Sequence, residues 1–142
     1  METVKFRVWN GKEMVYDIMA GKFGIFYVNP EKGDGLNTKD TACLSENTTK
    51  YPEGTPLMQF TGLLDRNGKE IYEGDIIKYF QPYANKWDTH IVLWDNKFAG
   101  FGMFEFNNEW CKESDWLKIK EIEIIGNIYE NSELLNQKGK KK

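Results

Sequence analysis

Carboxylates and glycines gather in one stretch of the chain, FTGLLDRNGKEIYEGDIIKY, which runs from Phe60 to Tyr79. Clustered carboxylates can bind a divalent metal, and glycine-rich loops can bind phosphate through their backbone amides. The stretch is therefore the first place to look for catalytic chemistry. Its acidic residues are Asp65, Glu70, Glu73 and Asp75, and its glycines are Gly62, Gly68 and Gly74.

Neither of two standard ligand-binding loops fits this stretch. A calcium loop needs a glycine at its sixth position and a glutamate at its twelfth. Counted from Asp65, the glycine is fourth and the twelfth residue is Ile76. A phosphate-binding loop needs Gly-Lys-Ser/Thr before a helix, whereas Gly68-Lys69 leads into a strand-like run. The sequence therefore argues against both loops.

The unusual residues of the stretch have roles in backbone turns instead. Asp65 can accept hydrogen bonds from turn amides, and Asn67-Gly68 supplies the left-handed conformation that closes a hairpin. Gly74-Asp75 then turns the chain into the apolar strand IIKYF. We favour these turns over a carboxylate metal site, and an enzyme that uses the four carboxylates with a metal is the least favoured hypothesis. No metal or cofactor is expected.

Aromatic and basic residues are interleaved in a second segment, between residues 83 and 101. Such residues can stack on nucleic-acid bases and attract phosphates, and they can equally fill a small core. In the run HIVLW, His90, Val92 and Trp94 share one strand face while two aliphatic residues occupy the other. A strand that is apolar on both faces is usually covered on both sides, which favours a core or oligomer contact. The candidate partner-binding or oligomer residues are Trp87, His90, Trp94, Lys97 and Phe98.

Catalytic motifs are absent from the sequence. His90 is the only histidine, and no nucleophile elbow, zinc motif or dinucleotide fingerprint accompanies it. Cys43 and Cys111 lie in no CxxC pair, so neither a zinc site nor a disulfide framework is indicated. We therefore expect a protein that is not an enzyme.

Composition and charge favour one folded domain of a cytoplasmic protein. The chain has 142 residues, of which 40% are hydrophobic and 15% aromatic, enough for a single core. It contains no membrane-length apolar run and no signal-like N-terminus, so no membrane partner is expected. The formal charge is −3, and without the four lysines of the last five residues it is −7. An acidic body disfavours nucleic acid as the main partner.

Period-2 alternation predicts a mainly β fold. Residues 4–8 alternate and precede Asn10-Gly11, the strongest short signal for a type I′ turn, so an N-terminal hairpin with a second strand over 14–19 is expected. One or two short helical segments are expected, at 109–120 and 131–135. Further strand-like runs lie at residues 23–28, 57–64, 70–73, 76–80, 90–94, 101–106 and 121–129.

The spacing of the turns suits a small barrel better than alternating strands and helices. We predict a single β domain over residues 1–135. Within it, residues 29–55 are expected to form a long polar loop or arm. Residues 136–142 are expected to be a disordered lysine-rich tail.

Three segments together closely resemble the YopX family of phage and prophage proteins. They are the stretch from Phe60 to Tyr79, the start VKFRVWNGKEMVY and the ending IEIIGNIYENSELL. The TGL-D-NG-KEIYEGDI core and the IGNIYEN ending occur in that order with the expected spacing. The resemblance, over residues 1–28 and 57–135, implies a mainly β, SH3-like or pseudo-barrel fold in a phage or prophage protein, and allows for self-association. The family has no established biochemical activity, so the resemblance implies no catalytic or ligand residues.

Two functional hypotheses follow. The leading one is a non-enzymatic phage accessory protein, a small β-barrel that binds another macromolecule and self-associates, with a phage or host protein preferred as partner. The alternative is a single-stranded nucleic-acid-binding protein that uses the aromatic and basic hairpin around Trp94.

Overall fold

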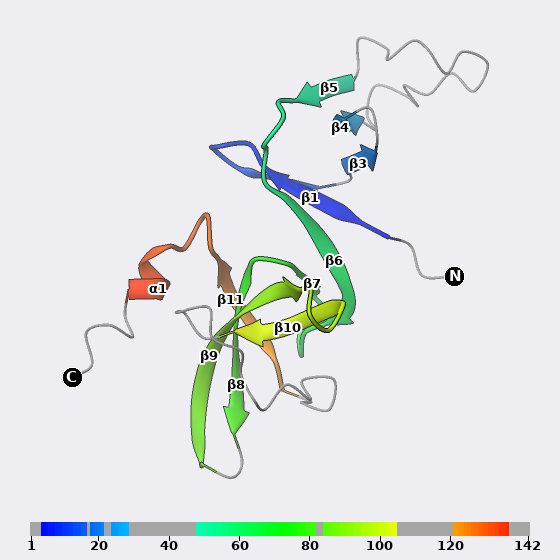
Figure 1. Ribbon diagram of the computed structural model, residues 1–142. Helices are drawn as coiled ribbons and strands as arrows, with labels where there is room; N and C mark the ends of the chain where they lie inside the picture. Colours follow the sequence, from blue (N-terminus) through cyan, green and yellow to red (C-terminus); the bar gives the residue numbers. More distant parts are fainter. Residues whose placement is uncertain are drawn as a thin grey trace. The chain divides into compact units, whose positions relative to one another are not determined.

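The computed structural model describes residues 4–16, 18–21, 24–28, 48–81, 84–104 and 121–136. The described residues form eleven strands and one short helix, with a curled antiparallel sheet that makes a half-barrel (Figure 1). The predicted mainly β pseudo-barrel is confirmed. Contacts divide the chain into two compact units, Met1–Gln59 (unit 1) and Phe60–Lys142 (unit 2).

Unit 1 begins with the expected hairpin. Strand β1 (Phe6–Trp9) pairs with β2 (Met14–Tyr16) and, on its other side, with the first residues of β6 (Leu57–Leu64). The predicted type I′ turn is wrong, because Trp9 pairs with Met14 and leaves a four-residue loop in which Gly11, but not Asn10, has a positive φ, of 95°. The side chain of Asn10 closes this longer loop by accepting the amides of residues 12 and 13, each at 2.8 Å.

A second sheet of unit 1 has the order β3-β4-β5 and is antiparallel. Its strands are β3 (Ile18–Gly21), β4 (Gly24–Val28) and β5 (Thr48–Tyr51). Strand β5 lies inside the segment 29–55 that we predicted as a long polar loop or arm, so a loop is wrong for residues 48–51. Threonine and tyrosine favour strands, and β4 supplies a backbone partner for each residue of β5. Residues 29–47 lie outside the described part of the chain.

Unit 2 contains an antiparallel sheet with the order β10-β9-β8-β11. The predicted helix at 131–135 is confirmed as α1, whereas 109–120 lies outside the described residues. No helix in the described ranges is long and apolar enough to cross a membrane. The elements of unit 2, after the end of β6, are β7 (Glu70–Tyr72), β8 (Asp75–Gln81), β9 (Lys86–Asp95), β10 (Gly100–Phe104), β11 (Glu123–Asn127) and α1 (Glu133–Asn136).

One face of this sheet carries the core of unit 2. Ile77 of β8 lies opposite His90 on β9 and Ile124 on β11, and Val92 lies opposite Met103. His90 is fully buried, with its ring 5.3 Å from that of Tyr79, so it belongs to the interior. The buried cluster consists of Ile71, Ile77, Tyr79, Val92, Met103 and Ile122.

Candidate functional site: the outer face of the unit 2 sheet

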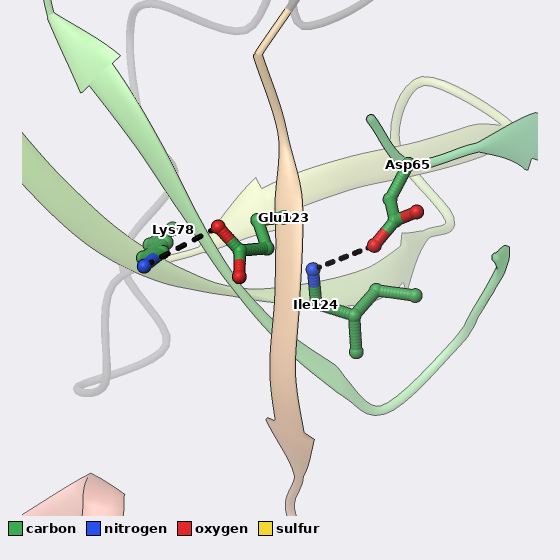
Figure 2. Close-up of polar contacts among 4 residues, drawn as sticks. All are labelled: Asp65, Lys78, Glu123 and Ile124. Atoms are coloured by element: carbon green, nitrogen blue, oxygen red, sulfur yellow. Dashed lines mark hydrogen bonds and ion pairs between the residues drawn. The ribbon is translucent and has the colours of Figure 1, made fainter. Parts of the chain in front are cut away.

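Asp65 binds the backbone of its own turn and of a distant strand. Its Oδ1 accepts the amides of Asn67 at 2.8 Å and Lys69 at 2.9 Å. Its Oδ2 accepts the amide of Ile124 in β11 at 3.2 Å (Figure 2). The predicted role of Asp65 in the turn is confirmed, and the bond to β11 is a contact that the sequence pattern did not reveal.

The electrostatic state of Asp65 follows from these bonds. Burial alone would raise its pKa, but hydrogen bonds from the amides of Lys69, Ile124 and Asn67, with the charge of Lys69, lower the pKa below the usual aspartate value. The carboxylate is therefore ionised at neutral pH, and both of its oxygens are engaged by backbone amides.

Gly74 and Asp75 have a similar structural role. Gly74 has a φ of 86°, donates its amide to Val92 O at 2.7 Å and accepts the Ile128 amide at 2.9 Å. Asp75 is buried and accepts the amide of Tyr72 at 2.8 Å. Within the part of the chain that the structure describes, no group of three His, Cys, Asp or Glu side chains could hold a metal.

The second family-like motif, IGNIYEN, also forms a compact turn. Asn127 Oδ1 accepts the amides of Tyr129 at 3.0 Å and Glu130 at 2.9 Å, while Asn131 Oδ1 accepts the amide of Asn127 at 3.1 Å. A Cβ at Gly126 would lie 2.5 Å from Asn131 Oδ1. The pairing of β11 with β8 shifts register between Ile124 and Gly126, and the close neighbour of Gly126 is the Asn131 side chain.

The two motifs that carry the family resemblance therefore meet in space. Ile128 donates to Gly74, Ile124 donates to Asp65, and Arg66 donates its amide to Ile122 O at 2.8 Å. Because these bonds join turns and strands, we interpret the two motifs as stabilising the fold. A functional surface has to be sought elsewhere.

The sheet face opposite Ile77 and Val92 buries Ile76 and Ile91, and beyond them it carries a group of aromatic and charged side chains, which we call the outer face. Cross-strand register aligns Glu123 with Lys78 and Lys78 with Thr89. Two residues further along the same strands, Phe80 lies opposite Trp87. Side chains that lie opposite each other on neighbouring strands, or two residues apart on one strand, share a face of the sheet and lie within contact distance. The outer face therefore consists of Lys78, Phe80, Trp87, Thr89 and Glu123.

Trp87 is the most prominent group on the outer face, because 49% of its surface is exposed. Its ring packs edge-on against Phe80, with centroids 5.6 Å apart. Lys78 Nζ lies 5.4 Å from the centroid of the Trp87 ring and 3.3 Å from Glu123 Oε2. Figure 2 shows Lys78 and Glu123 on one side of β11 and Asp65 on the other. The indole is thus held in place while remaining accessible.

The candidate partner-binding residues do not form one surface. Trp87 and Trp94 are seven positions apart on β9, so they point to opposite faces and are separated by about 23 Å along the strand. We call the other group, Trp94, Lys97, Phe98 and Phe101, the hairpin tip. Trp94 and Phe98 are 42% and 64% exposed, and the Trp94 ring contacts Phe101 edge-on at 5.1 Å.

Sequence reasoning missed four members of the outer face, Lys78, Phe80, Thr89 and Glu123. Phe80 and Lys78 could have been predicted from the hairpin formed by β8 and β9. Residues at equal distances from its turn pair with each other, so that Phe80 lies opposite Trp87 and Lys78 lies two residues further along the same face. Glu123 gave no such signal, because its strand is distant in the chain and joins the sheet only in the tertiary structure.

The fold and these junctions define a small β pseudo-barrel protein whose two sequence motifs are joined by backbone hydrogen bonds. A family model described as YopX protein matches residues 5–136, and the chain belongs to this family.

The solved structures similar to this chain include two crystal structures. Protein EF1440 from Enterococcus faecalis shares 27% identity with a TM-score of 0.61, covering 95% of this chain and 99% of that one. Protein yopX from Bacillus subtilis shares 21% identity with a TM-score of 0.51, covering 92% and 96%, and supports the fold alone. Comparison with curated protein sequences finds no match.

Proposed function

We propose that this chain is a phage or prophage accessory protein of the bacterial cytoplasm that binds another protein through the outer face and does not act as an enzyme. The observation that carries the proposal is Trp87, half exposed yet packed edge-on against Phe80. Exposed aromatic side chains that need little ordering are the usual anchors of protein interfaces.

The charge of the molecule supports a protein partner over a nucleic acid. The chain carries a formal charge of −3, and Lys78, whose ammonium group lies over the Trp87 ring, already pairs with Glu123. A phosphate backbone would have to compete with that carboxylate and with the acidic body.

The hairpin tip supports self-association as a second part of the proposal. Trp94 and Phe98 expose large apolar surfaces in the same hairpin, and exposed apolar groups of this size commonly mark interaction sites. The two surfaces lie on opposite faces of β9 at Trp87 and Trp94, so a partner and a second copy could bind together.

Single-stranded nucleic acid remains the alternative, favoured by Lys97 in the same hairpin as the exposed rings of Trp94 and Phe98. Rings and lysines together can stack on bases and neutralise phosphates. This alternative requires binding of labelled single-stranded DNA at low salt and its loss in Trp94→Ala. Without binding at low salt it should be dropped.

Affinity capture from nuclease-treated host lysate tests the main proposal. The wild-type chain and Trp94→Ala should retain the same protein, and Trp87→Ala should lose it, because only the last variant removes the anchor of the outer face. Mass spectrometry identifies the retained protein, and the nuclease excludes bridging by nucleic acid. Equal capture by all three chains would count against the outer face.

A further inference from the structure

The outer face already holds a cation, which is the ammonium group of Lys78. Its Nζ lies 5.4 Å from the Trp87 centroid, within the range over which an aromatic ring attracts a positive charge. The same atom lies 3.3 Å from Glu123 Oε2. An indole face and a carboxylate therefore converge on one ammonium group, and both come from strands next to β8.

The internal cation is held loosely. The side chains of Lys78 and Glu123 are 37% and 30% exposed, and ion pairs at such sites contribute little because water competes for both groups. Lysine also has a flexible stem that can return its ammonium group to solvent at small cost. A better cation could therefore take its place without disturbing the strands.

We propose that the outer face binds an arginine side chain of the protein partner, which displaces Lys78 from Trp87 and Glu123. This inference rests on the proposed function and specifies the chemistry of its partner. A guanidinium is planar and weakly hydrated, stacks on aromatic rings and can pair with a carboxylate through two N–H groups. It fits an indole beside a carboxylate better than an ammonium group does.

Charge complementarity points to the same occupant. The chain is acidic overall, with a formal charge of −3, and acidic side chains outnumber basic ones among the described residues of unit 2. A basic protein segment would be attracted to this unit before contact and would place its arginine at the outer face.

Binding of a short triarginine peptide tests the inference, with the matched tricitrulline peptide as control. Citrulline has almost the shape of arginine but no charge. The readout is the indole N–H resonance of Trp87 in a two-dimensional NMR spectrum, identified among the five tryptophans by its loss in Trp87→Phe. We expect the arginine peptide to shift this resonance and the citrulline peptide to leave it unchanged.

Two variants should change the affinity for the arginine peptide in opposite directions. Lys78→Met keeps the apolar stem and removes the competing cation, so the arginine peptide should bind about two- to fivefold more tightly. Glu123→Gln removes the carboxylate and should weaken binding by about the same factor. Lys86→Met changes the net charge as Lys78→Met does but lies on the opposite face of β9, so it should produce a smaller gain. Circular dichroism confirms that each variant is folded.

Several outcomes would overturn the inference. Equal shifts with both peptides would exclude arginine as the specific ligand. They would still indicate an apolar docking site, so the proposed function would not be contradicted. Weaker binding in Lys78→Met would make Lys78 a direct ligand contact, as a phosphate or nucleic acid requires. If the Trp87 indole resonance shifted with protein concentration in the absence of any peptide, the occupant would be a second copy of this chain. No shift with the arginine peptide would also contradict it, while the capture experiment judges the proposed function separately.

Discussion

Asp65 shows what one side chain contributes to this fold. Its carboxylate joins a tight turn to a strand that begins far along the chain, through the amide of Ile124, 59 residues away. Trp87 differs, because its neighbours on the outer face hold it without covering it. Single residues thus divide into those that close the fold and those that remain accessible to a partner.

Asp65→Asn should lower the free energy of unfolding by about 1–3 kcal/mol. An amide has one carbonyl oxygen, so it cannot accept the turn amides at Oδ1 and the Ile124 amide at Oδ2 together. Urea denaturation at neutral pH measures the loss. The matched control is Asp95→Asn, since Asp95 accepts the amide of Lys97 in an exposed turn and its replacement should cost less.

The loss should also depend on pH. Because the pKa of Asp65 is lowered in the folded chain, its stabilising effect is present above the unfolded aspartate pKa of about 3.9 and disappears as the pH falls through the lower folded value. The difference in unfolding free energy between wild type and Asp65→Asn should therefore shrink in acid. A difference independent of pH would show that the charge of Asp65 contributes nothing.

At the scale of elements, β11 is held on both sides. It pairs with β8 through backbone bonds and the Lys78–Glu123 ion pair, and Asp65 accepts the Ile124 amide from its other side (Figure 2). Its end is fixed by the turn in which Asn131 lies against Gly126. The outer face depends on this arrangement, because β11 contributes Glu123.

Gly126→Ala should destabilise the protein by about 1–3 kcal/mol, because the added methyl group would overlap Asn131. Thermal or urea unfolding measures the effect. Asn131→Ala removes the obstructing side chain but also the bond to the Asn127 amide. The double variant should therefore lose less than the sum of the two single changes. Strict additivity would indicate that the two residues do not interact.

At the scale of the whole molecule, the chain forms two compact units whose boundary falls within β6. The single domain over residues 1–135 and the disordered tail stay predictions. Unit 2 contains both proposed surfaces, the outer face and the hairpin tip, on the sheet that also contributes Ile77, Tyr79, Val92 and Met103 to the core. One strand, β9, therefore serves the core and both surfaces.

Self-association through the hairpin tip should weaken when its exposed rings are removed. We expect the wild-type chain to sediment as an oligomer at micromolar concentration. The double variant Trp94→Ala/Phe98→Ala should shift toward monomer, because it removes exposed apolar surface. Trp87→Ala is the matched control and should sediment like the wild type. A wild-type monomer throughout the concentration series would argue against the oligomer.

Much of the fold could be predicted from the sequence. Alternation identified most of the strands, because side chains of a strand point to opposite faces in turn, but it missed β5. The turn roles of Asp65, Gly68 and Gly74 followed from local hydrogen bonding and from positive φ at the two glycines, 81° and 86°. The prediction failed at Asn10-Gly11, because the side chain of Asn10 closes a longer loop than the dipeptide alone indicates.

The sequence by itself determined the mainly β class, the turns at Asp65 to Gly68 and at Gly74-Asp75, and the two motifs of the YopX family, because these depend on periodicity and short-range backbone chemistry. Only the tertiary structure decided that His90 is buried, that Trp87 and Trp94 belong to different surfaces, and that Glu123 meets Lys78. These facts depend on which strands pair and in which register, and register is set by contacts between residues that are remote in the chain.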